Sequence, residues 1–215
     1  SGSGKSASFI LPLIQILLKT KGNALNENLS EFDESSEELD TQESNNSSSV
    51  NDEEEEIEDY SEEASTDEEI VASKPKNGPK VLILAPTREL ANQISASIRR
   101  FTKELDLRYG ILVGGAPYPP QVRMLKKPID FLVATPGRLL DHLKNNRVNF
   151  DKIEFLVIDE INRMLDMKMN EDLKEIYSYI PISQTLENGE IKKRQTLLFS
   201  GSLDSEALEE ISREY

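Results

Sequence analysis

The sequence predicts an α/β fold in which a parallel sheet is flanked by helices. Three observations indicate this class: five short runs rich in Val, Ile, Leu and Phe, helical patterns between these runs, and small or polar residues directly after each run. Nearly uninterrupted apolar runs are typical of strands that are buried on both faces. Strands that alternate with helices are typical of a parallel sheet, because its strands are joined by helical crossovers.

The predicted elements follow one another along the chain. A first helical pattern starts after Lys5, and Pro12 inside it predicts either a kink or a late start of that helix. The runs for which strands are predicted span residues 81–85, 111–113, 131–134, 155–158 and 196–199. Apolar residues three or four positions apart predict helices within 90–105, 139–143 and 169–180, and a last helix near Leu203.

Residues 20–79 differ from the rest of the chain in composition. This block holds 20 of the 40 acidic residues and 3 of the 25 basic ones, and it is rich in Ser and Asn. Few apolar residues and strong charge repulsion predict a disordered acidic insertion. The predicted domain therefore comprises residues 1–19 and 80–215, in which 20 acidic and 22 basic residues nearly cancel. The overall charge of −15 thus does not exclude a nucleic-acid partner.

Several classes of protein are disfavoured by composition. The chain has no cysteine, so neither a disulfide framework nor a thiolate metal site is expected. Its most apolar stretch, residues 10–18, is far shorter than the roughly 20 residues that a membrane span needs, and no signal peptide is recognised. We therefore expect an intracellular protein with no membrane partner.

Two motifs indicate nucleoside triphosphate chemistry. Asp159 and Glu160 directly follow an apolar run, where Asp159 is suited to hold Mg²⁺ and Glu160 to orient or deprotonate an attacking water. The chain also opens with a sequence like the end of a phosphate-binding loop: Ser1, Gly2, Ser3, Gly4, Lys5 and Ser6. In such loops the backbone N–H groups and the lysine approach phosphates, and the serine hydroxyl can bind magnesium. The alternatives are a cloning linker and two carboxylates that cap a helix.

Polar or small residues also follow the other predicted strands. In open α/β sheets, ligands bind beyond the carboxyl ends of the strands, so these residues are expected to form one functional surface. Arg88 and Arg138 suit phosphate contacts, with hydrogen bonds from Thr87 and Thr135. The alternative is that both threonines are helix N-caps and both arginines are surface charges. His142 is interpreted as an ordinary surface residue. Residues 183–194 are interpreted as a solvated loop with a turn at Asn188-Gly189, and the alternative is that its basic cluster, Lys192 to Arg194, contacts phosphate.

Together these residues resemble the first RecA-like lobe of DEAD-box RNA helicases over nearly all of the chain outside 20–79. The resemblance rests on the order and spacing of short motifs. Residues 1–6 resemble the end of motif I, 86–91 motif Ia, 114–115 the GG element, 135–138 motif Ib, 159–162 motif II, 163–167 the run that follows it, and 194–202 the strand that ends in motif III. The resemblance implies a RecA-like P-loop NTPase domain whose first strand would precede Ser1.

The resemblance also implies a function, an ATP-dependent RNA helicase that couples ATP hydrolysis to the unwinding or remodelling of RNA duplexes. ATP and Mg²⁺ would be bound by residues 1–6 and by Asp159 and Glu160. RNA would lie along Pro86, Thr87, Arg88, Gly115, Thr135, Gly137 and Arg138, and coupling would involve Asn162, Ser200 and Ser202. Such helicases use a second RecA-like lobe, so the isolated lobe is expected to be inactive. They reside in the nucleus or the cytoplasm.

Some residues depart from the family pattern. Asn162 lacks the charge of the usual aspartate, Ile161 adds bulk where alanine is usual, and Lys168 replaces a glycine. Gly201 loosens the backbone between two serines where alanine is usual. These changes leave open an alternative, a nucleotide-gated RNA clamp or scaffold with weakened unwinding. The acidic insertion is either a tolerated loop insertion or a segment that binds basic proteins.

Overall fold

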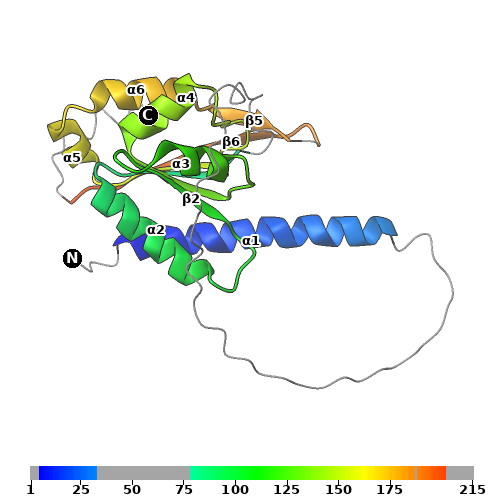
Figure 1. Cartoon of the computed structure of the whole chain (residues 1–215). Coiled ribbons are helices and arrows are strands. Elements are labelled where there is room, and N and C mark those ends of the chain that lie inside the picture. The colour runs from blue at the N-terminus through cyan, green and yellow to red at the C-terminus, as the bar shows by residue number, and fades with distance from the viewer. Residues whose placement is uncertain (1–4, 33–77, 187, 202–215) are drawn as a thin grey trace, which may run out of the picture. The chain divides into compact units, whose positions relative to one another are not determined.

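The computed structural model of the chain describes residues 5–32, 78–186 and 188–201 (Figure 1). The chain divides into two compact units: one comprises Ser1–Gln15 with Ala72–Tyr215, and the other comprises Ile16–Val71. The first unit contains a five-stranded parallel sheet with helices on its faces, which confirms the predicted fold class. Within the described residues, no helix is both long and apolar enough to cross a membrane.

The strands of this sheet lie in the order β2-β3-β1-β4-β7. They are β1 (Val81–Leu84), β2 (Tyr109–Leu112), β3 (Phe131–Ala134), β4 (Phe155–Ile158) and β7 (Gln195–Leu198). All five predicted strands are therefore confirmed. The main difference is at β2, which starts at Tyr109 and not at residue 111 as predicted. Gly110 interrupts the apolar pattern of the sequence, but it does not interrupt the strand. A side chain at Gly110 would collide with Met124, so the glycine permits close packing of helix α3 (Tyr118–Leu125).

Both faces of the sheet are buried. Leu82 and Leu84 of β1 belong to a core cluster that includes residues of α4 (Pro136–Lys144), α5 (Ile161–Asp166) and α6 (Asn170–Ser178). Successive residues of a strand point to opposite faces, so Val81 and Ile83 face the other layer. Figure 1 shows α2 (Arg88–Thr102) on the side of the sheet opposite α4 and α6. The helices predicted from residues 90–105, 139–143 and 169–180 are thus confirmed.

Helix α1 (Lys5–Phe32) begins where the helical pattern was predicted to begin, but it extends further than predicted. It begins at Lys5 and contains Pro12, so a late start caused by the proline is wrong. It also continues beyond Thr20, where the sequence predicted the start of the acidic insertion. Residues 33–77 and the helix expected near Leu203 lie outside the described residues, and for them the predictions stay untested.

The interpretation of residues 183–194 as a loop is wrong, although none of the described residues in this stretch is buried. They form an antiparallel hairpin of β5 (Ser183–Thr185) and β6 (Ile191–Lys193), and the predicted turn contains Gly189 at a φ of 82°. Lys192 forms an ion pair with Glu154, and the Gln184 Nε2 donates a hydrogen bond to the Ile153 carbonyl at 3.0 Å. The hairpin is therefore tied to the residues that precede β4.

His142 is buried, so its interpretation as a surface residue is also wrong. Its imidazole stacks on the ring of Tyr118, with centroids 4.4 Å apart and 7° between the planes. Burial, with smaller contributions from the positive charges of Arg138 and Arg147, lowers the pKa of His142 to about 4. The imidazole is therefore neutral at neutral pH and packs as a flat, largely apolar group.

Replacing His142 with Gln is expected to flatten the dependence of stability on pH. The pKa is about 4 in the folded protein and 6.5 in the unfolded chain, so the unfolded state binds more protons between these values. The free energy of unfolding should consequently fall by up to roughly 3 kcal/mol as the pH decreases across this window. Since His142 is the single histidine of the chain, its replacement should remove most of the slope above about pH 5. Urea unfolding of both proteins at a series of pH values measures this, and equal slopes would contradict it.

Candidate functional site

The register of the sheet brings the loops after its strands to one edge. Leu112 of β2 pairs with Ala134 of β3, and Ala134 pairs with Leu84 of β1. Leu84 pairs in turn with Ile158 of β4, and Ile158 pairs with Leu198 of β7. Each of these five residues is the last of its strand, so all strands end at the same level. The polar residues that follow them therefore meet at one edge, as the sequence predicted.

Lys5, Asp159 and Glu160 come together at this edge. The Lys5 ammonium lies 3.0 Å from the Glu160 carboxylate and donates a hydrogen bond to it, although the two residues are 155 positions apart. The Glu160 N–H donates to the Asp159 Oδ1 at 3.0 Å, which fixes the orientation of the buried Asp159 carboxylate. The hydrogen bond and charge of Glu160 raise the pKa of Lys5, whereas burial raises the pKa of Asp159.

The backbone around Glu160 is unusual. Glu160 adopts the left-handed conformation with a φ of 54° and precedes the short helix α5. Ile161 is fully buried in the core, so its bulk is accommodated there. Lys168 also has a positive φ, 58°, and it stands where a glycine is usual in the family that the sequence resembles. The conformation that a glycine adopts easily is thus kept although the residue is a lysine.

The loop after β7 approaches the Lys5–Glu160 pair. A Cβ atom at Gly201 would lie 3.6 Å from the Lys5 Nζ and 3.7 Å from the Glu160 Oε2, which are ordinary contact distances. An alanine would therefore fit at this position without displacing either charged group. Ser202 and residues 1–4 lie outside the described residues, so their predicted roles stay predictions.

The carboxylates of Asp159 and Glu160 fit a metal ion that takes most of its ligands from phosphate and water. Within the described residues, no cluster of three or more His, Cys, Asp or Glu side chains forms a metal cage. Two neighbouring carboxylates beside a lysine are sufficient for Mg²⁺ when phosphate oxygens and water complete its coordination. The residues present therefore fit a magnesium ion that arrives with a phosphate ligand.

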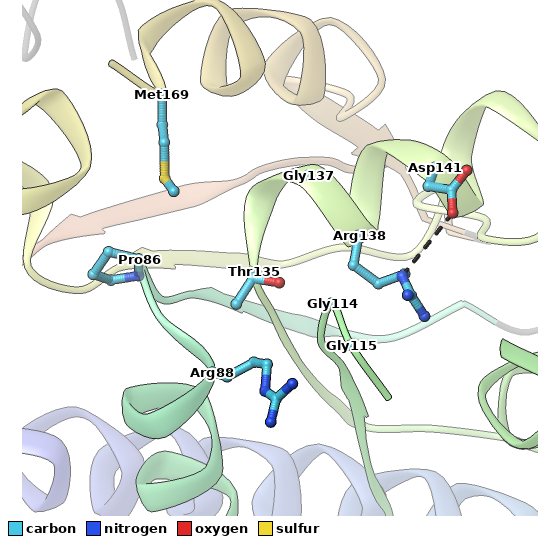
Figure 2. A pocket seen from close by; sticks show the side chains of 9 residues that line it. All are labelled: Pro86, Arg88, Gly114, Gly115, Thr135, Gly137, Arg138, Asp141 and Met169. Carbon is cyan, nitrogen blue, oxygen red and sulfur yellow. Dashed lines mark ion pairs between the residues drawn. The ribbon is translucent and has the colours of Figure 1, made fainter. Parts of the chain in front are cut away.

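A second part of the edge is an open groove with a volume of about 780 Å³ (Figure 2). Its lining comprises Pro86, Arg88, Gly114, Gly115, Thr135, Gly137, Arg138, Asp141 and Met169. Six of the seven residues predicted to lie along RNA are in this set. The seventh, Thr87, is the N-cap of α2, and its hydroxyl accepts a hydrogen bond from the Leu90 N–H at 3.3 Å. Thr135 precedes α4 without such a side-chain hydrogen bond, which leaves its hydroxyl available to the groove.

The loop of residues 113–117 forms one wall of the groove and is held by two side chains. The Arg138 Nη1 donates a hydrogen bond to the Ala116 carbonyl at 3.1 Å. The buried Gln121 amide donates to the carbonyls of Val113 and Pro117, each at 3.2 Å. Sequence reasoning missed Gln121, as well as the lining residue Asp141, whose carboxylate lies 4.0 Å from the Arg138 Nε. The spacing of Asp141, three residues after Arg138 on a predicted helix, was the available signal.

The family model and the similar proteins all point to DEAD-box helicases. The family model for DEAD/DEAH box helicases matches residues 1–211. The pre-mRNA-splicing ATP-dependent RNA helicase PRP28 of Scheffersomyces stipitis is 32% identical over 221 residues, which cover 100% of this chain and 37% of that protein. The ATP-dependent RNA helicase DBP2 of Chaetomium thermophilum is 45% identical over 113 residues, 52% of this chain and 20% of that protein.

A solved structure is also similar. The crystal structure of the yeast DEAD-box splicing factor Prp28 matches with a TM-score of 0.59 and 34% sequence identity, over 66% of this chain and 31% of that chain. The chain thus spans between about a fifth and two fifths of the length of these relatives. The observed sheet, with its flanking helices, corresponds to the RecA-like fold of that structure.

Replacing Gly115 with Ala is expected to destabilise the protein by about 1 kcal/mol or more, because its φ of 73° is strained for alanine. The added Cβ would also collide with the Arg88 guanidinium and displace it from the groove. The matched control is Gly114→Ala, since nothing lies within 4 Å of a Cβ there and φ is not positive. Urea unfolding should show a loss for Gly115→Ala alone, and equal losses would contradict the prediction.

Proposed function

Because the chain belongs to the DEAD/DEAH box helicase family, we propose that it is the ATP-binding and RNA-binding lobe of an ATP-dependent RNA helicase. This helicase would couple ATP hydrolysis to the unwinding or remodelling of RNA duplexes. The observation that carries the proposal is the contact between Lys5 and Glu160 beside Asp159, on the same sheet edge as the groove. The relatives are named as RNA helicases, which does not favour the alternative of an RNA clamp.

ATP is proposed to bind where Lys5 now contacts Glu160. Its phosphates would replace the carboxylate as the partner of the Lys5 ammonium, with residues 1–4 and Ser6 around them. Glu160, released from Lys5, would then orient the attacking water and accept its proton. Asp159, with Ser6, would hold Mg²⁺, which supplies charge neutralisation on the phosphates when it is bound. A lysine that is protonated and half-exposed can make this exchange without burying a new charge.

RNA is proposed to lie in the groove. Arg88 and Arg138 supply positive charges from two different helices, and the residues between them are small enough for a sugar-phosphate backbone to approach (Figure 2). Contacts of this kind go to phosphate and sugar, so they give affinity with little sequence preference. The groove also contains Met169, which offers an apolar surface beside these polar groups.

Several further parts of the proposal concern the whole protein. A second RecA-like lobe would close over ATP and RNA, and Asn162, Ser200 and Ser202 would transmit ATP turnover to the RNA. The names of the relatives, one of which refers to pre-mRNA splicing, support a location inside the cell, in the nucleus or cytoplasm. The acidic residues within 20–79 are proposed either to be a tolerated insertion or to bind basic proteins.

Replacing Glu160 with Gln in the full-length protein that carries this lobe is expected to lower RNA-stimulated ATP hydrolysis about 100-fold or more. The amide cannot accept the proton of the attacking water, whereas the binding of a fluorescent ATP analogue should persist. Glu171→Gln is the matched control, because Glu171 is an exposed carboxylate at the start of α6. Hydrolysis at the wild-type rate in Glu160→Gln would remove the proposed role of this residue.

The effect of Asn162 is tested by replacing it with Asp in the same protein. We expect single-stranded RNA to stimulate ATP hydrolysis strongly in the unaltered protein, since Asp159 and Glu160 are both present, and the replacement to change the rate only modestly. Asn92→Asp, on the exposed face of α2, controls for the added negative charge. Weak turnover that only Asn162→Asp restores would instead indicate a weakened motor and favour the clamp.

A further inference from the structure

Tyr118 lies at the start of α3, directly after the 113–117 loop, and three side chains contact its ring. His142 stacks on the ring at 4.4 Å, and the guanidinium carbons of Arg147 and Arg138 lie 4.8 and 5.3 Å from its centroid. We refer to Tyr118, His142, Arg138 and Arg147 as the Tyr118 cluster. The Tyr118 hydroxyl and both His142 nitrogens are buried without a hydrogen-bond partner among the described residues. Ring contacts therefore hold the cluster together.

The neutral state of His142 allows two arginines to share one tyrosine ring. A guanidinium is attracted to the electron-rich face of an aromatic ring when it lies within about 6 Å. A protonated imidazole stacked on the same ring would place a third positive charge beside Arg138 and Arg147. Burial and the two arginines together lower the pKa of His142 to about 4, so this repulsion does not arise at neutral pH.

Arg138 is the member of the cluster that lines the groove. Three contacts hold its guanidinium: the Tyr118 ring, the Ala116 carbonyl at 3.1 Å and the Asp141 carboxylate at 4.0 Å. Its side chain is only 16% exposed, in contrast to a solvated surface arginine. A guanidinium that is already fixed loses little conformational entropy when it binds a phosphate, so its position contributes to affinity.

We propose that Tyr118 is a positioning residue for RNA binding: its ring, supported by His142, holds Arg138 against the 113–117 loop. The loop and helix α4 would then present their phosphate-binding groups in one fixed arrangement. Tyr118 itself does not line the groove, so it acts through Arg138. The inference rests on the proposed function, since it concerns how the same groove binds RNA.

The test measures binding of a labelled single-stranded RNA to the full-length protein, with a non-hydrolysable ATP analogue, at several salt concentrations. Tyr118→Leu removes the aromatic face but keeps an apolar side chain, and it should weaken binding about fivefold to tenfold. The slope of log K against log salt should decrease in magnitude by about 0.7, as expected for one lost phosphate contact. Tyr118→Phe keeps the ring, so this variant should have the affinity and the slope of the unaltered protein.

A double-mutant cycle separates positioning from general destabilisation. Arg138→Ala should weaken binding in the unaltered protein but have little further effect in Tyr118→Leu, because the two residues act as a unit. Arg123→Ala removes an exposed positive charge from the same helix as Tyr118 and should leave the slope unchanged. Additive effects of Tyr118→Leu and Arg138→Ala would overturn the inference.

If Tyr118→Leu does not fold, His142→Gln tests the same inference, because it removes the ring that supports Tyr118 and changes no charge at neutral pH. RNA binding should again weaken about fivefold, although the groove residues themselves are unaltered. Wild-type affinity and slope in this variant would overturn the inference. An unaltered protein that binds no RNA would instead overturn the proposed function, and the inference with it. RNA binding that is intact in Tyr118→Leu would remove the positioning role alone.

Discussion

The parallel pairing of five strands, in a register that ends them all at one level, is the constraint on which the rest of the structure depends. Four-residue strands such as β1 and β4 are buried over their whole length, so they have no room for a polar group. Polar groups are consequently confined to the loops beyond the strand ends. Both the Lys5–Glu160 contact and the groove are results of this separation, although their residues come from distant parts of the chain.

The fold could be predicted well wherever burial is continuous along the chain. The bounds of β3 and β4 agree with the apolar runs, because each residue of these strands faces a core. The β5–β6 hairpin could not be predicted in this way, since its strands are short, polar and exposed on alternate positions. It is stabilised by contacts of Lys192 and Gln184 with residues about 30 to 40 positions away, and such contacts leave no local pattern.

The candidate site shows the same limit. Residues next to a strand end, such as Arg88 and Gly115, could be placed at the edge from their position alone. His142 could not, because its burial depends on Tyr118, which belongs to a helix that the sequence did not predict. Gln121 was missed for the same reason. The side chains that touch a ligand are thus easier to find than those that hold them in place, since only the former occupy a fixed place in the strand pattern.

The left-handed backbone of Glu160 restricts which residues can replace it, independently of catalysis. At a φ of 54°, β-branched side chains such as Val, Ile and Thr are sterically disfavoured, whereas Asn, Asp and Gly are tolerated. A lineage that loses the carboxylate would therefore reach a small set of replacements first, whatever selection acts on hydrolysis. The backbone conformation at position 160, and not hydrolysis alone, therefore restricts which residues replace Glu160. Replacements found in relatives that no longer hydrolyse ATP should be interpreted with both constraints in mind.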